Sequence, residues 1–234
     1  MKELILFLCL VISSVMTRAQ SVWELGAFVG VSGYSGDVNP TLTPRFQDFT
    51  PSLGVIAHTN LSNRLGFRGG ITYIKLKGDD DNYPGREVRD FDFSTNLVEL
   101  SILGEWEPFG SNRYFTDAAG NRNVDRLISP YLFTGVALIG GVLNTNFSNF
   151  PGGNEEVKVG ILKDRGYGNS LLGVSIPVGI GMKFDIADAL TLGVEGCIRA
   201  SFSDYLDGIS FSGSPDAKDI YMNGGIILYY RFGR

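Results

Sequence analysis

Hydrophobic and polar residues alternate along eight stretches of the chain, each about ten residues long. Alternation with a period of two places successive side chains on opposite faces of an extended strand. In 22–31, for example, Trp23, Leu25 and Val29 share one parity and Glu24 and Gly26 the other. The eight predicted strands fall in 22–31, 52–59, 64–74, 96–106, 131–140, 174–183, 190–201 and 220–232. Segment 131–140 is apolar on both parities, so the pattern does not orient it.

The second face of these strands separates two classes of protein, a secreted soluble β-domain and an outer-membrane β-barrel. That face is rich in glycine and carries few charges, of both signs, as in the interior of a narrow barrel where ions must pair. Strands of about 9–11 residues are long enough to cross a bilayer when tilted. The pattern therefore predicts an all-β fold, an eight-stranded antiparallel transmembrane β-barrel; a solvated sheet face with ordinary mixed charge is the alternative. The predicted charge network of the lumen comprises Glu24, Arg68, Glu99, Glu105, Lys183, Glu195, Arg199 and Arg231.

The lengths of the connections favour the barrel. The odd-numbered connections, 32–51, 78–92, 142–169 and 203–218, are long, whereas 61–63 and 184–188 are short. Long extracellular loops and short periplasmic turns are typical of outer-membrane barrels. Aromatic residues are predicted to form a girdle at the periplasmic rim, where amphipathic rings favour the interface. These are Trp23, Trp106, Tyr131, Phe184, Tyr230 and Phe232.

The first nineteen residues have the features of an export signal. Lys2 precedes a short apolar run, and Thr17-Arg18-Ala19 supplies small residues before a cut after Ala19, which leaves 20–234 as the barrel domain. Export predicts the outer membrane of a Gram-negative bacterium as the location. The remaining chain has 18 basic and 24 acidic residues, a formal charge of −6, which argues against nucleic acid as a partner. Its one cysteine, Cys197, cannot form an internal disulfide.

Candidate chemistry is sparse, and no cofactor or metal site is predicted. Asp204 and Asp207 follow the seventh strand and are interpreted as a strand exit that meets water rather than as a catalytic pair. The single histidine, His58, would need a neighbouring serine, such as Ser52 or Ser101, to act in a hydrolase. The acidic run 78–82 lacks the spacing of an EF-hand loop and is interpreted as a solvated loop.

Several segments resemble a known family of small β-barrels. They are 24–40, 64–80, 129–138, 176–210 and the last strand, and the most specific is IPVGIGMKFDIADALTLGVEGCIRASFSDYLDGIS. They resemble the PorG-type outer-membrane barrels of Bacteroidetes, components of the type IX secretion system. The resemblance implies a non-enzymatic barrel that couples a periplasmic ring protein or lipoprotein to the outer membrane. A stand-alone structural or surface-recognition barrel and, third, a lipid-modifying enzyme in the barrel wall remain as alternatives.

The connection 107–129 is long although the strand count places it on the periplasmic side. Periplasmic turns are normally a few residues, so this one is predicted either to dock a periplasmic partner or to be an insertion without a role. Aromatic residues and arginine are enriched at interface hot spots. The candidate contact residues are Phe109, Arg113, Tyr114, Phe115, Arg122 and Arg126. Because an eight-stranded barrel is only wide enough for its own side chains, a permanent aqueous pore is not expected.

Overall fold

A computed structural model describes residues 23–41, 44–83, 89–110, 114–120, 122–124, 128–187, 189–213 and 218–232. For 114–116 and 122–124 it describes the backbone alone. The predicted export signal, 1–19, lies outside the described residues.

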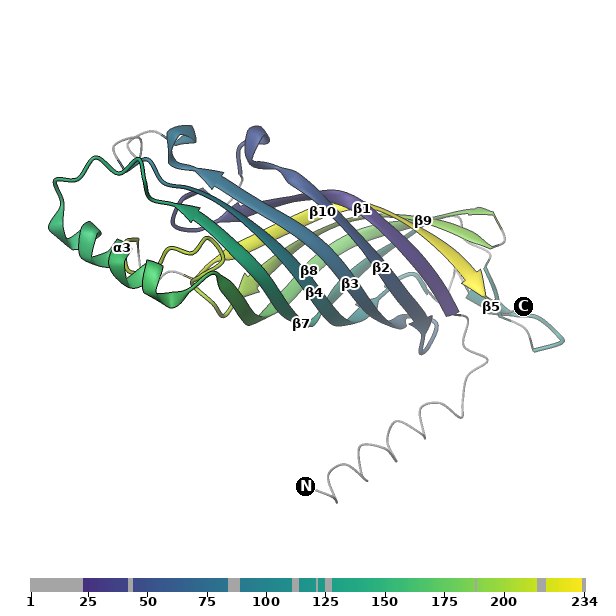
Figure 1. The fold of residues 1–234 in the computed structure, drawn as a ribbon. Coiled ribbons are helices and arrows are strands. Elements are labelled where there is room, and N and C mark those ends of the chain that lie inside the picture. Colours follow the sequence, from purple (N-terminus) through teal and green to yellow (C-terminus); the bar gives the residue numbers. More distant parts are fainter. Residues whose placement is uncertain are drawn as a thin grey trace, which may run out of the picture.

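Eight antiparallel strands form one closed barrel (Figure 1). The ring closes where the first strand pairs with the last, from Trp23 opposite Phe232 to Ser35 opposite Ile220. This confirms the predicted fold class. The wall strands are β1 (Trp23–Ser35), β2 (Thr50–Asn60), β3 (Leu65–Asp79), β4 (Asp92–Trp106), β7 (Ile128–Asn146), β8 (Ser170–Ala187), β9 (Leu190–Ser201) and β10 (Ile220–Phe232).

The outer face of the wall is an apolar belt. Exposed and buried residues alternate along every strand, and the exposed positions are mostly aliphatic or aromatic. A soluble domain would bury such a continuous surface, whereas a barrel in a bilayer presents it to hydrocarbon. The belt includes Leu25, Val29, Leu53, Val55, Ile71, Val98, Leu100, Ile102, Val136, Leu138, Val178, Ile180, Val194, Ile198, Ile226 and Leu228. Among the described residues, no helix is long and apolar enough to cross a membrane.

Strand β7 takes the orientation that its sequence left open, and this corrects one prediction. Tyr131 and Phe133 face the lumen and are buried, whereas Leu132 is exposed on the outer wall. Tyr131 is therefore not part of the rim girdle, to which Trp23, Trp106, Tyr230 and Phe232 contribute exposed rings. The reason is steric, because inward-facing glycines of the neighbouring strand β8 leave room for the rings. A Cβ on Gly181 would overlap the ring of Tyr131, and one on Gly179 would overlap that of Phe133.

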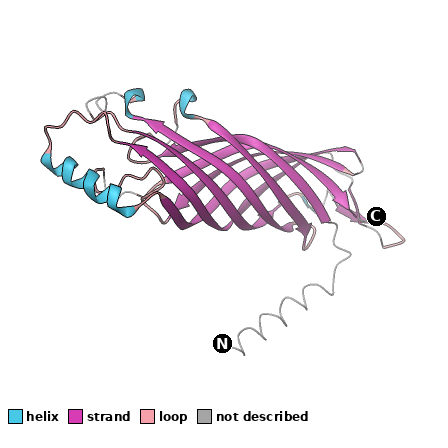
Figure 2. Cartoon of the chain, viewed as in Figure 1, coloured by secondary structure: helices cyan, strands magenta, loops and turns pink. Residues whose placement is uncertain are grey.

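The connections at one end of the barrel are folded rather than open loops (Figure 2). They contain the 3-10 helices η1 (Phe46–Asp48) and η2 (Asp80–Asn82) and the α-helix α3 (Glu155–Tyr167). The long connection expected at 142–169 begins later than predicted and contains a helix, because β7 continues to Asn146 and α3 follows. The side chain of Asn154 accepts hydrogen bonds from the backbone of Glu156 and Val157, which satisfies free N–H groups at the start of α3.

The opposite end carries two tight turns and one hairpin. The turns join β2 to β3 and β8 to β9, and the hairpin consists of β5 (Tyr114–Thr116) and β6 (Arg122–Val124). The hairpin lies at the end where β10 finishes (Figure 1). Since short turns and both ends of the wall occur here, this end is the periplasmic one by the general rule for outer-membrane barrels.

Candidate functional site

The periplasmic third of the lumen is filled by ionic side chains from several strands. Glu24 on β1 lies 3.0 Å from the Nδ1 atom of His58 on β2 and 3.0 Å from the Arg231 guanidinium on β10. Arg231 also contacts Asp185 at 3.1 Å. Neighbouring strands thus supply opposite charges at the same height, which offsets the cost of removing each charge from water.

A second group in this layer is centred on Lys183, which is completely buried. Its ammonium forms ion pairs with Glu105 and, at 2.9 Å, with Glu107. Glu107 in turn accepts a hydrogen bond from the hydroxyl of Ser129 at 2.7 Å. The lysine therefore ties β8 to the end of β4.

The middle of the lumen is bridged by one arginine. The Arg68 guanidinium on β3 donates to both carboxylate oxygens of Glu195 on β9, at 2.7 and 3.3 Å, and lies 4.0 Å from the centre of the Phe133 ring. The hydroxyl of Tyr131 donates to the same carboxylate at 2.8 Å. Strands β3 and β9 are not neighbours in the ring, so this contact holds opposite parts of the wall together.

A third ionic group lies further toward the extracellular side. Arg199 donates to both oxygens of Glu99, at 2.6 and 2.9 Å, and to the side-chain oxygen of Asn223 at 2.6 Å. The Tyr221 hydroxyl also donates to Glu99, at 2.7 Å. The small cavity between this group and Arg68 measures about 10 Å³, which is no larger than one water molecule requires.

An apolar plug closes the extracellular part of the lumen. It is built from buried side chains of several strands and of the folded connections. Aromatic pairs contribute, such as Tyr34 with Phe93, whose ring centres lie 4.7 Å apart. Other members are Val38, Ile74, Leu76, Phe91, Leu97, Ile139, Leu206 and Ile209. The lumen is therefore filled along its length, by ionic side chains in its periplasmic and middle parts and by apolar side chains in its extracellular part.

The carboxylates of Asp204 and Asp207 do not meet water, and that interpretation was wrong. They follow the end of β9, but the loop folds inward over the barrel mouth, so that Asp207 is completely buried and Asp204 nearly so. The Tyr34 hydroxyl lies 2.6 Å from both Asp207 Oδ2 and Asp219 Oδ1. One hydroxyl proton cannot be donated to two carboxylates, so both contacts are hydrogen bonds only when one of the acids is protonated.

Burial is the main reason that these acids hold protons. It raises the pKa of Asp219 to about 8 and that of Asp204 to about 6, and it raises the pKa of Asp207 well above its usual value. Repulsion from the neighbouring acids, including Asp37, acts in the same direction. The group is therefore a buried cluster of acids that share protons in the extracellular cap, and its carboxylates are not presented to a substrate.

The acidic run 78–82 is also more buried than predicted. Asp80 is completely buried and forms a two-point ion pair with Arg89, whose Nε lies 2.7 Å from Oδ2. Asp79 accepts a hydrogen bond from the backbone of Asp81 at the start of η2. Within the described ranges, no group of three or more His, Cys, Asp or Glu residues is placed to hold a metal ion.

The surroundings of His58 are carboxylates rather than a serine. Its Nδ1 atom contacts Glu24, and its Nε2 atom lies 3.4 Å from Glu105. Ser52 is six residues away on the same strand, about 20 Å at the usual rise of a strand. Ser101 lies opposite Gly70 on the neighbouring strand pair. The geometry of a Ser-His-acid hydrolase is not formed by these residues.

Part of the candidate periplasmic contact lies within the described residues. Phe109 is about half exposed just after β4. Tyr114 and Phe115 belong to β5 and Arg122 to β6, where only the backbone is described. Arg113 and Arg126 lie outside the described residues.

Sequence reasoning missed two members of the lumen network, Glu107 and Asp185. Both continue the inward parity of their strands, Glu107 after Glu105 and Asp185 after Lys183. The predicted strand ends at 106 and 183 excluded them, and extending the alternation by one step would have found both.

Comparisons with known proteins concern mainly outer-membrane proteins. A family model described as a domain of unknown function (DUF6089) matches residues 2–234. Among solved structures, Neisserial surface protein A matches with 11% identity over 91% of this chain and 96% of that one, with a TM-score of 0.45. A major outer membrane protein from Thermus thermophilus matches with 16% identity over 92% and 100%, with a TM-score of 0.46.

The attachment invasion locus protein Ail of Yersinia pestis, in complex with the heparin analogue sucrose octasulfate, matches with 12% identity over 91% of this chain and 100% of that one, with a TM-score of 0.44. The search of curated proteins found no match.

Proposed function

Since the chain belongs to the family described as a domain of unknown function (DUF6089), we propose its function from the barrel itself: a non-enzymatic, non-conducting anchor in the outer membrane that holds a periplasmic partner. The filled lumen is the observation that carries this proposal. Ion pairs occupy its periplasmic and middle parts, and an apolar plug occupies its extracellular part. Because the described lumen is filled, we assign the function to the two rims of the barrel.

The periplasmic rim offers one extended feature, the β5–β6 hairpin. Its base is fixed to the barrel, because the backbone N–H of Glu107 donates to the carbonyl of Arg64 and Gly110 packs against the carbonyl of Asn63. A segment anchored at one end to a rigid barrel loses less conformational freedom on binding than a free one. The finer assignment, a coupling component of the type IX secretion system, is supported by the resemblance of 24–40, 64–80 and 176–210 to the PorG-type family.

The extracellular cap supports a second candidate, a surface-recognition barrel. Helix α3 packs against the plug through Ile161 and exposes Val159 and Leu162. The ring of Tyr167 stacks on Tyr205, with ring centres 4.3 Å apart. Exposed apolar side chains on an ordered cap are typical of binding surfaces.

A trimmed hairpin tests the first candidate. Replacing 114–124 with Asn-Gly keeps Glu107 and Gly110, which contact the turn between β2 and β3, and an Asn-Gly turn suits a short hairpin. The variant should insert into the membrane as the wild type does, yet lose its crosslinked periplasmic partner and, in a cell with type IX secretion, the export of its substrates.

The matched control replaces the exposed cap residues Val159 and Leu162 with Ser and leaves the hairpin intact. This variant should keep the partner. If the trimmed protein still copurifies with the partner and secretion continues, the hairpin is not the contact. If only the cap variant loses binding, and the ligand lost is an extracellular one, the surface-recognition barrel is supported instead.

A further inference from the structure

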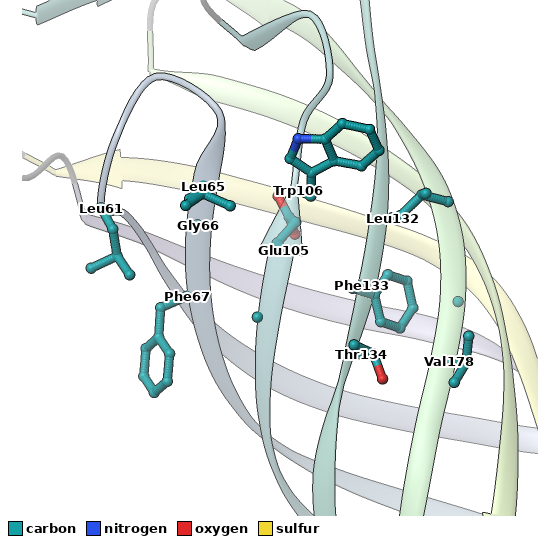
Figure 3. A pocket seen from close by; sticks show the side chains of 12 residues that line it. Leu61, Leu65, Gly66, Phe67, Glu105, Trp106, Leu132, Phe133, Thr134 and Val178 are labelled. Carbon is teal, nitrogen blue, oxygen red and sulfur yellow. The ribbon is translucent and has the colours of Figure 1, made fainter.

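A groove of about 570 Å³ cuts into the outer wall near its periplasmic end (Figure 3). It lies on strands β3, β4, β7 and β8, below the turn that carries Leu61. The register of the sheet explains it. Phe67, Gly104, Thr134 and Val178 are consecutive partners across these strands and all point outward. Large side chains stand at both ends of this row, whereas its two central positions carry a hydrogen atom and a short side chain.

The next set of outward-facing residues toward the periplasm forms the end of the groove. Leu65, Trp106 and Leu132 are partners in register, and each is about half exposed. Figure 3 shows the Trp106 indole lying across this end of the groove between the two leucines. Ring and leucines together form a ledge at the height where amphipathic aromatic rings meet the membrane interface.

The described lining of the groove offers a ligand few polar groups, the hydroxyl of Thr134 and the indole N–H of Trp106 at its rim. Glu105 and Phe133 line it with backbone only, since their side chains point into the lumen and are buried. Their backbone groups belong to the hydrogen-bonded ladder of the wall. The hydroxyl of Thr134 is already donated to the carbonyl of Pro177 at 2.9 Å. A peptide would leave its own N–H and C=O groups unsatisfied there, whereas a hydrocarbon chain would not.

We propose that this groove binds an acyl chain of a phospholipid from the periplasmic leaflet. The groove is continuous with the apolar belt that faces hydrocarbon, so a chain can enter sideways from the bilayer. Arg64 is exposed in the turn next to Leu65, and a positive charge at this end of the wall favours the phosphate of such a lipid. Because lipid is as apolar as the groove, binding draws on van der Waals contact with the groove walls rather than on the hydrophobic effect.

The two tryptophans of the chain provide a matched test. Trp23 and Trp106 are equally exposed on the outer wall at the periplasmic end, and only Trp106 lines the groove. Trp23→Phe leaves Trp106 as the fluorophore, and Trp106→Phe leaves Trp23. The probe is a phosphatidylethanolamine brominated on one acyl chain, which is titrated into the detergent-solubilised barrel. It should quench the fluorescence of Trp106 in a saturable way. The lipid mole fraction at half-quenching should be about tenfold lower for Trp106 than for Trp23, equivalent to about 1.4 kcal/mol.

Filling the groove should remove this difference. In the Trp23→Phe background, Gly104→Leu places a side chain in the groove without a clash, since its Cβ would lie 3.9 Å from the nearest atom. The control Gly196→Leu adds the same side chain to the outer face of β9, where nothing lies within 4 Å. Gly104→Leu should raise the midpoint of Trp106 quenching about tenfold, and Gly196→Leu should leave it unchanged. Both variants should still migrate differently on a gel before and after heating, which shows that the barrel is folded.

Identical quenching of Trp23 and Trp106, or an unchanged curve for Gly104→Leu, would overturn the proposal. A change in oligomeric state for Gly104→Leu without any change in quenching would also overturn it, because a second copy of the chain would then be the occupant.

Discussion

At the scale of single residues, the protein is held together by ion pairs that cross its interior. Arg68 with Glu195 and Arg199 with Glu99 each join strands that are not neighbours in the ring. Each arginine makes two parallel contacts with a carboxylate, the geometry that a guanidinium fits best. Removing one partner of such a pair leaves the other charge buried, which is the costly outcome.

Replacing Arg199 with Ala should therefore destabilise the barrel strongly. Glu99 is completely buried and would lose its counter-ion, at a cost of about 3–5 kcal/mol. Equilibrium unfolding in urea measures the loss. Adding Glu99→Gln should recover much of it, because the stranded charge is removed.

The exposed pair of Lys158 and Glu155 on α3 serves as the control. Its atoms lie 2.7 Å apart, but the side chains are 46% and 83% exposed, so Lys158→Ala should cost no more than about 0.5 kcal/mol. Equal losses for Arg199→Ala and Lys158→Ala would mean that water reaches the lumen and screens its charges.

At the scale of elements, the extracellular cap is a folded lid rather than a set of loops. The loop after β9 is fixed by its own acids: the backbone N–H of Leu206 donates to Asp219 at 2.7 Å, and that of Ile209 donates to Asp207 at 2.8 Å. The protons held by these acids make the lid sensitive to pH. In an unfolded loop the acids would ionise near pH 4, whereas in the lid the pKa of Asp219 is about 8.

The raised pKa of Asp219 determines whether the lid gains or loses stability as the pH rises. The stability contributed by Asp219 is fully present below about pH 4 and is lost as the pH rises through about 8. Loop 202–219 should therefore resist protease better at about pH 5 than at about pH 9. Lys218 faces Asp204, and Arg89 faces Asp37 and Asp207, so these are the nearby cations.

Asp219→Asn is the matched variant for this prediction, because the amide oxygen can still accept from Leu206 while the titrating proton is gone. The pH dependence of cleavage should become flatter, with the remainder due to Asp204 and Asp207. A wild-type loop that is cut at the same rate at both pH values would contradict the assignment of the shared proton.

At the scale of the whole molecule, closure of the sheet determines behaviour in detergent. A closed barrel has no free strand edge from which to unravel, so unheated and boiled samples should migrate differently on a gel. Reconstituted into a planar bilayer, the same protein should show no steady conductance, since the plug around Leu97 and Ile139 is completely buried. Identical migration before and after boiling, or a stable open channel, would contradict this picture.

The sequence alone determined the wall of this protein. Alternation has the same period as the strand, so the eight strands, the outward belt and the inward charges of Glu24, Arg68, Glu195 and Arg199 could all be predicted from local pattern. The one strand with apolar residues on both faces, β7, could not be oriented, because its inward face was decided by the space over Gly179 and Gly181 on the neighbouring strand.

Only the tertiary structure decided what lies inside and above the wall. Closing the sheet brings Arg68 to Glu195 and Arg199 to Glu99 across at least one hundred residues of sequence, and no local period encodes such a distance. The same closure buries the acids after β9, which read as a solvated turn because a loop carries no repeating pattern to reveal its burial. The register of four separate strands, rather than any motif, places Gly104 beside Thr134 and opens the groove in the outer wall.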